Sequence, residues 1–153
     1  MKKTYKTYKQ GMFKPINKSK CKSELCIYRS GLELTYMRFL DSNSSIVSWG
    51  SEKIIIPYIK PTDGKMHRYF TDFNFTIKDK NNKLHKFIVE IKPAKQCAPP
   101  KNTPKKRKKT LLYEQIAWAT NSAKWKAAGE WAEKHGYKFT IVTELDIKKL
   151  NNG

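Results

Sequence analysis

Two carboxylates and a lysine in the middle of the chain have the types and spacing that metal-assisted chemistry needs. They are Asp72, Glu90 and Lys92. Segments 68–78 and 84–92 are rich in β-branched and aromatic residues and are separated by a polar turn, which predicts a β-hairpin. If Lys78 pairs with Leu84, Asp72 lies directly across from Glu90. Alternate residues of a strand share a face, so Lys92 is expected on the face of Glu90.

Two opposed carboxylates destabilise a strand pair unless a positive charge lies between them. Mg²⁺, or Mn²⁺ in its place, would supply that charge, with the carboxylates of Asp72 and Glu90 and the carbonyl of Ile91 as ligands. Lys92 could orient or deprotonate an attacking water and offset charge on a phosphoryl group. The alternative is a pair of surface acids balanced by Lys92. The apolar strand 87–92 around Glu90 favours the metal site.

The formal net charge of +19 is concentrated in two segments of the chain. Residues 1–23 carry eight lysines and no acid, and residues 91–113 carry eight basic residues and no acid. Such segments are typical of proteins that bind the backbone of DNA through released counterions. Solubility, or contact with an acidic protein, is the alternative. The residues expected to contact DNA are Arg29, His67, Lys95, Lys105, Lys106, Arg107, Lys108 and Lys109.

The elements that must position these residues can be predicted from periodicity and end signals. A helix is expected over 31–40, because Ser30 and Glu33 form a capping-box pattern. A helical region from Leu112 ends at His135-Gly136, with a break at 120–122 left open. Further strands are expected at 46–49, 52–59 and 138–143, and a helical turn at 146–150. This order predicts a mixed α/β domain whose β-sheet is flanked by helices.

The chain length of 153 residues suits one domain, and two segments stand apart from it. Residues 1–22 lack apolar periodicity and are expected to form a basic N-terminal arm, with Tyr5, Tyr8 and Phe13 as anchors. Residues 23–150 should form the domain, with a basic, proline-rich loop at 93–109. No segment resembles a membrane span or a signal peptide, so a cytoplasmic protein is expected. Three cysteines without a CxxC pair favour neither disulfides nor zinc.

The order of these residues resembles a known nuclease signature. Tyr69-Phe-Thr-Asp72, followed by Val89-Glu-Ile-Lys92-Pro93, is similar to the motif of the PD-(D/E)xK superfamily, with Thr71 in place of the usual proline. Members of this superfamily often carry an additional acid on a preceding helix, and Glu33 occupies that place. The resemblance therefore implies a catalytic role for Glu33, while its capping role remains the alternative.

Two families within this superfamily share longer stretches with the chain. Residues 11–100 are similar to the head completion nucleases of T-even-type tailed phages, and residues 121–144 resemble TnsA-type endonucleases. The resemblance implies a restriction-endonuclease-like fold and a Mg²⁺-dependent DNA endonuclease acting on packaged phage DNA before tail attachment. It also implies phage capsid, portal or neck proteins as partners, in the host cytoplasm or on the virion. The alternatives are a non-catalytic DNA-binding structural protein of the virion and an RNA-binding basic protein.

Overall fold

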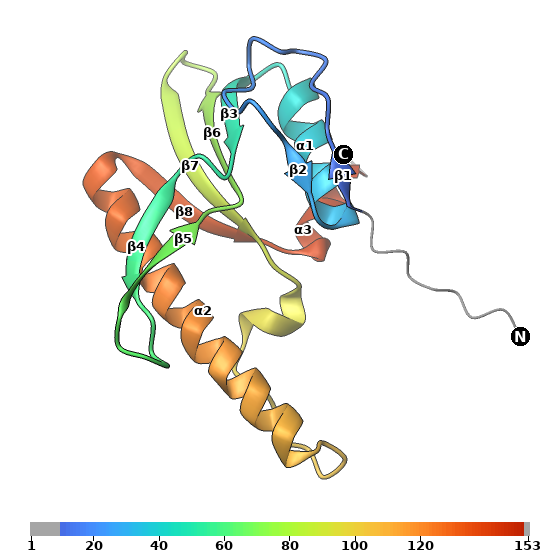
Figure 1. Ribbon diagram of the computed structural model, residues 1–153. Coiled ribbons are helices and arrows are strands. Elements are labelled where there is room, and N and C mark those ends of the chain that lie inside the picture. Colours follow the sequence, from blue (N-terminus) through green and yellow to red (C-terminus); the bar gives the residue numbers. More distant parts are fainter. Residues whose placement is uncertain (1–9, 152–153) are drawn as a thin grey trace, which may run out of the picture.

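A four-stranded mixed sheet forms the centre of the computed structural model, which describes residues 10–151 (Figure 1). The strand order is β3-β6-β7-β8. Strands β3 (Ile46–Ser51), β6 (Phe73–Lys78) and β7 (Leu84–Ile91) are antiparallel neighbours, and β8 (Tyr137–Val142) runs parallel to β7. The predicted mixed α/β class, with helices flanking the sheet, is therefore confirmed.

Helices cover both faces of this sheet. Helices α1 (Gly31–Ser42) and α3 (Glu144–Asn151) lie on one face, where Met37, Leu40 and Ile147 join the buried residues of the strands. The long helix α2 (Lys108–His135) packs on the other face beside a two-stranded ribbon, β4 (Ile55–Ile59) and β5 (Met66–Phe70). Figure 1 shows the first half of α2 extending beyond the sheet.

Strand β7 contributes to both cores because its side chains alternate between the two faces. Val89 and Ile91 are buried in the cluster under α1 and α3. Ile88 is buried in the cluster under α2 and the ribbon. Glu90 follows Ile88 on that second side, so the fold places a carboxylate beside α2.

The register predicted for the hairpin is confirmed, but its first strand was wrongly predicted as one continuous strand. Lys78 pairs with Leu84, and the ladder runs to Phe73 opposite Val89. Segment 68–78 is nevertheless two strands, since Thr71 and Asp72 separate β5 from β6. The buried Thr71 donates both its backbone N–H and its hydroxyl to the carbonyl of Ile54, which directs the preceding residues toward β4 instead of the sheet.

The predicted helices form with small differences at their ends. Ser30 caps α1 by accepting a hydrogen bond from the Glu33 N–H at 3.1 Å. Helix α2 is continuous across 120–122 and begins at Lys108, so the last two residues of the predicted loop are helical. A 3₁₀ turn, η1 (Ala94–Cys97), lies within that loop. Helix α2 ends at His135 and is capped by Gly136, whose φ of 76° favours glycine, and β8 begins directly afterwards.

The segment before α1 crosses the face of the domain that α1 and β3 share. Strands β1 (Gly11–Met12) and β2 (Ile27–Tyr28), which the sequence did not predict, pair in an antiparallel ribbon. The rings of Phe13 and Trp49 lie 6.0 Å apart, and the buried Asp41 carboxylate accepts a hydrogen bond from the Ile16 N–H at 2.9 Å. The expected anchors Tyr5 and Tyr8 lie outside the described residues. No helix within residues 10–151 is long and apolar enough to cross a membrane.

Candidate active site

Asp72 lies at the point where the chain passes from the ribbon into the central sheet. The ladder ends one residue later, so Asp72 is not a ladder partner of Glu90. Its side chain instead reaches across to β7, where Oδ2 accepts a hydrogen bond from the Ile91 N–H at 2.8 Å. This bond fixes the carboxylate beside the last residues of β7.

Glu90 is 8% exposed and is held by two neighbours. The Tyr69 hydroxyl donates a hydrogen bond to Glu90 Oε2. The Lys92 Nζ lies 3.5 Å from Glu90 Oε1, which makes an ion pair. The structure therefore brings Asp72, Glu90 and Lys92 together at one end of β7.

The two carboxylates affect each other because water is largely excluded from both. The pKa of Asp72 is raised to about 8, first by burial and then by the negative charge of Glu90, while the Ile91 N–H opposes the rise. The charge of Glu33 raises it further. Burial and the charge of Glu90 also raise the pKa of Tyr69, so its hydroxyl remains a donor. The arrangement favours a bound cation.

The donor atoms of this pair suit a small, hard cation. Among the described residues, Asp72 Oδ1 makes no hydrogen bond, and Glu90 Oε1 has an ion pair with the Lys92 ammonium and no hydrogen bond. Mg²⁺ binds one or two carboxylates and completes its coordination with waters and substrate phosphate. Within residues 10–151 no group of three or more His, Cys, Asp or Glu side chains is arranged to hold a metal ion. The fit to Mg²⁺ rests on the carboxylate oxygens of Asp72 and Glu90 alone.

Glu33 and Arg29 lie at the start of α1, beside this pair. Glu33 Oε2 accepts a hydrogen bond from the Arg29 N–H at 3.2 Å, and Oε1 lies 3.4 Å from the Ser30 hydroxyl. The Arg29 guanidinium pairs with Glu52 at 2.6 Å, which raises the pKa of Arg29, and the charges of Glu33 and Asp72 add to that rise. The Glu33 carboxylate thus bonds to the Arg29 N–H and the Ser30 hydroxyl, and not to the Ser30 N–H that a capping box would use, and it also contributes charge near Asp72.

The other predicted DNA contacts lie further out. His67 is on the ribbon and pairs with Asp63 at 2.7 Å. Lys95 is exposed in η1, and Lys106 pairs with Glu114 at 2.8 Å. The remaining residues of the basic run are exposed at the end of the loop and the start of α2; they are Lys105, Arg107, Lys108 and Lys109.

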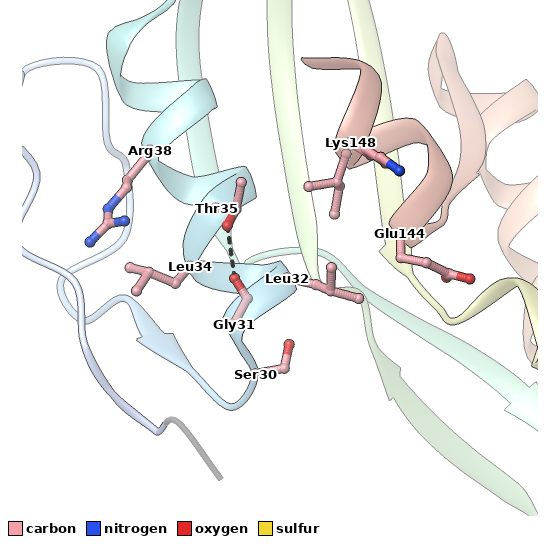
Figure 2. Close-up of a pocket in the computed structure, with 9 residues that line it drawn as sticks. Ser30, Gly31, Leu32, Leu34, Thr35, Arg38, Glu144 and Lys148 are labelled. Atoms are coloured by element: carbon pink, nitrogen blue, oxygen red, sulfur yellow. Dashed lines mark hydrogen bonds between the residues drawn. The ribbon is translucent and has the colours of Figure 1, made fainter. Parts of the chain in front are cut away.

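Two pockets lie near the segment that follows Lys92, and neither is lined by Asp72, Glu90 or Lys92. A shallow pocket of about 540 Å³ opens between the first turns of α1 and α3, with Ser30 and Glu144 in its lining (Figure 2). Glu144 also accepts a hydrogen bond from the Ala94 N–H at 2.8 Å, which links α3 to the segment after Lys92. A second pocket, of about 810 Å³, lies between loop 94–106 and α2. The segment that follows the site therefore has an open surface on each side.

Sequence reasoning missed Lys124 of α2. Its Nζ lies 5.4 Å from the centroid of the Tyr69 ring and 5.8 Å from that of Tyr58. Burial lowers the pKa of Lys124, and the negative charge of Glu90 opposes that change. A signal was available, because Lys124 precedes the buried residues Ala128 and Ala132 by four and eight positions and so lies on the same helix face.

Comparison with known proteins gives two matches that span the site. The family model described as "TnsA-like endonuclease N terminal" matches residues 43–144. The protein named "Head completion nuclease" of Enterobacteria phage T4 is 39% identical over 145 residues, covering 92% of this chain and 94% of that protein. The family match includes Asp72, Glu90, Lys92 and Lys124, whereas Glu33 precedes it.

Proposed function

The chain belongs to the TnsA-like endonuclease family, and from this premise we propose that it is a Mg²⁺-dependent DNA endonuclease. The substrate bond is a phosphodiester, and the site is formed by Asp72, Glu90 and Lys92. The observation that carries the proposal is a buried carboxylate, Glu90, and a partly buried one, Asp72, beside a lysine at the end of β7. Such a pair has no structural benefit without a cation, since each charge disfavours the other.

Asp72, Glu90 and the carbonyl of Ile91 would hold the metal. A bound Mg²⁺, or Mn²⁺, would polarise the phosphoryl oxygen and lower the pKa of a bound water. Tyr69 orients Glu90 through its hydroxyl, and the Ile91 N–H orients Asp72. These two bonds keep the carboxylates in place before substrate arrives.

Lys92 has its ammonium in the same site, 3.5 Å from Glu90. From there it positions the attacking water and stabilises the negative charge that develops on the phosphoryl oxygens. Glu33 adds a third negative charge on the α1 side, and Arg29 lies next to it with its guanidinium paired to Glu52. We assign Glu33 a supporting catalytic role and Arg29 a contact with the DNA backbone.

The basic segments would bind the DNA that enters this site. Lys95 lies in the turn η1 after β7, the run Lys105–Lys109 lies at the end of the loop that follows, and four residues of that run are exposed. His67 adds a basic group on the ribbon side. We keep the division into a basic arm at 1–22 and a nuclease domain at 23–150 with its loop at 93–109. Backbone contacts of this kind give affinity without sequence preference.

The biological setting follows from the relative in phage T4, whose name describes head completion. We propose that this chain acts on packaged phage DNA before tail attachment. Capsid, portal or neck proteins would be its partners, in the infected host cell or on the virion. The alternative is a DNA-binding structural protein of the virion, which the net charge of +19 would also suit.

Cleavage of supercoiled plasmid by the purified protein tests the proposal. Wild type should nick or linearise plasmid with Mg²⁺ and lose this activity in EDTA. Asp72→Ala and Lys92→Ala should not cleave but should still bind DNA. Glu130→Ala and Lys126→Ala are matched controls, because both residues are exposed on α2 and lie outside the carboxylate site.

Two results would count against this function. Equal cleavage by wild type and the Asp72→Ala variant would overturn the site. DNA binding without any Mg²⁺-dependent cleavage, even with phage capsids added, would favour the structural alternative.

A further inference from the structure

Lys124 brings a second ammonium group toward the site from α2, the helix that packs over the face of the sheet to which Glu90 points. It extends from α2, whereas Lys92 follows β7. The Tyr69 ring lies between Lys124 and Glu90, since its face contacts the lysine and its hydroxyl bonds to the carboxylate. Lys124 is thus one aromatic ring away from Glu90.

The charge of Lys124 is not neutralised by the protein. Among residues 10–151 no hydrogen bond or ion pair involves its Nζ, although the side chain is half-buried. Its neighbours are the faces of Tyr58 and Tyr69, which attract a cation but accept no hydrogen bond from it. A half-buried ammonium with three unused donors is a site for an anion.

The charged groups around Lys124 indicate which anion would bind. Glu90 and Asp72 attract its charge, and Lys92 and Lys60 oppose it. Each carboxylate already has a partner, in Tyr69 and Lys92 for Glu90 and in the Ile91 N–H for Asp72. An anion that enters between Lys92 and Lys124 would satisfy both ammonium groups and relieve their mutual repulsion. A DNA phosphate positioned at the carboxylate pair has this charge.

We propose that Lys124 is a further catalytic residue, which contacts the DNA phosphate at the Asp72–Glu90–Lys92 site and stabilises the negative charge of the transition state. This inference rests on the proposed nuclease function. It assigns different tasks to the two lysines, because Lys92 also pairs with Glu90 whereas Lys124 is free to bind substrate. Tyr58 and Tyr69 hold the Lys124 side chain in position for that contact.

Substitutions at Lys124 separate this role from a structural one. Lys124→Met keeps most of the aliphatic stem and removes the charge, and Lys124→Arg keeps the charge and the contact with the tyrosine rings. Lys126→Met removes a charge from an exposed position of the same helix and is the matched control. Two measurements are needed: single-turnover cleavage with Mg²⁺, and DNA affinity at several salt concentrations with Ca²⁺ in place of Mg²⁺.

Lys124→Met should lower the cleavage rate about 10- to 100-fold, as expected for loss of one group that stabilises transition-state charge. It should also reduce the slope of log affinity against log salt by about one. Lys124→Arg should recover part of the rate, and Lys126→Met should change neither quantity. If Lys124 only joins α2 to the ribbon, Lys124→Met lowers the melting temperature while its rate and salt slope equal those of Lys126→Met, which overturns the inference.

The two readouts also separate this inference from the proposed function. If wild type binds DNA but never cleaves it, the nuclease proposal fails and with it the catalytic role of Lys124. If wild type cleaves and Lys124→Met cleaves equally well, only the inference about Lys124 fails.

Discussion

Strand β7 sends Val89 and Ile91 into one side of the sheet and Ile88 and Glu90 toward the other, and the two sides are built differently. The side under α1 and α3 is filled with large apolar groups, among them Trp49 and Phe73 with ring centroids 6.4 Å apart. The side under α2 has a smaller cluster, in which the buried residues of the helix are Ala128 and Ala132, and Ala123, Ala127 and Trp131 of the same helix pack against it partly buried.

Because its buried residues are alanines, helix α2 can pack close to the sheet. Polar side chains meet at the end of this packed region. Glu90, Tyr69 and Lys124 lie there, and Asp72 approaches from the break between β5 and β6. Mutual repulsion and burial make this cluster costly for the fold. The comparison indicates that one face stabilises the domain, while the other gives up stability to hold a charged site.

The largest effect is expected from Glu90→Gln. The variant keeps an oxygen to accept the Tyr69 hydrogen bond but loses the negative charge beside Asp72. Cleavage should fall at least about 10³-fold, since a metal ligand and its charge are lost. Stability without metal should remain equal or rise, because the repulsion between the carboxylates disappears. Plasmid cleavage and urea unfolding in EDTA measure the two quantities.

The Glu130→Gln variant is the matched control, since it removes an exposed acid from α2. A marked loss of stability in Glu90→Gln would contradict the proposed division of roles between the two faces.

Phe73→Ala should have the second-largest effect. It should lower the stability of the domain and leave the cleavage reaction unchanged. Phe73 is 1% exposed and its ring centroid lies 5.6 Å from that of Tyr36 across the first face. Truncation of such a phenylalanine costs about 3–5 kcal/mol of unfolding free energy. Urea unfolding followed by tryptophan fluorescence measures this loss.

The cleavage rate per folded molecule, measured at low temperature, should remain near that of wild type. A fall in this rate as large as that in Glu90→Gln would show that the first face also controls the chemistry.

The sequence predicted the parts of this arrangement that depend on local pattern. The register between Lys78 and Leu84 follows from the period of two and the polar turn, and it was predicted correctly, whereas the predicted pairing of Asp72 with Glu90 was wrong because the ladder ends at Phe73. The break at Thr71 was missed because it depends on hydrogen bonds to Ile54, a contact that no local pattern encodes. Lys124 was missed although its spacing to Ala128 and Ala132 gave a signal, because alanines are small and mark the buried face of a helix only weakly.

A smaller effect concerns pH. The pKa of Asp72 is raised to about 8 in the folded protein, above the value of about 3.9 expected for an unfolded chain. The folded state therefore holds more protons between these values, and stability falls as pH rises through them. One such proton gives a slope of at most about 1.4 kcal/mol per pH unit. Urea unfolding in EDTA from pH 5 to 8 should show this decline, and Asp72→Asn should reduce it.

Added Mg²⁺ should also flatten the decline, because the metal favours the ionised carboxylate. An unchanged slope in Asp72→Asn would mean that other groups cause the pH dependence and that the charged face costs the fold little.

The smallest effects are expected at the start of α1. There Ser30 has a structural role, and Glu33 is proposed to support catalysis. Ser30→Ala removes the acceptor for the Glu33 N–H and should cost about 1 kcal/mol of unfolding free energy. Glu33→Gln keeps an oxygen for the Arg29 N–H but removes the charge that Asp72 experiences. If Glu33 supports catalysis, Glu33→Gln should lower cleavage about tenfold with little change in stability.

The two variants therefore test whether the catalytic site includes the start of α1. A Ser30→Ala variant that loses stability while it cleaves normally, beside a stable Glu33→Gln variant that cleaves slowly, assigns capping to Ser30 and chemistry to Glu33. Normal cleavage by Glu33→Gln would restrict Glu33 to its structural bonds with Arg29 and Ser30. The site would then consist of the residues that β7, α2 and the break at Asp72 supply, all of which lie within the matched range 43–144.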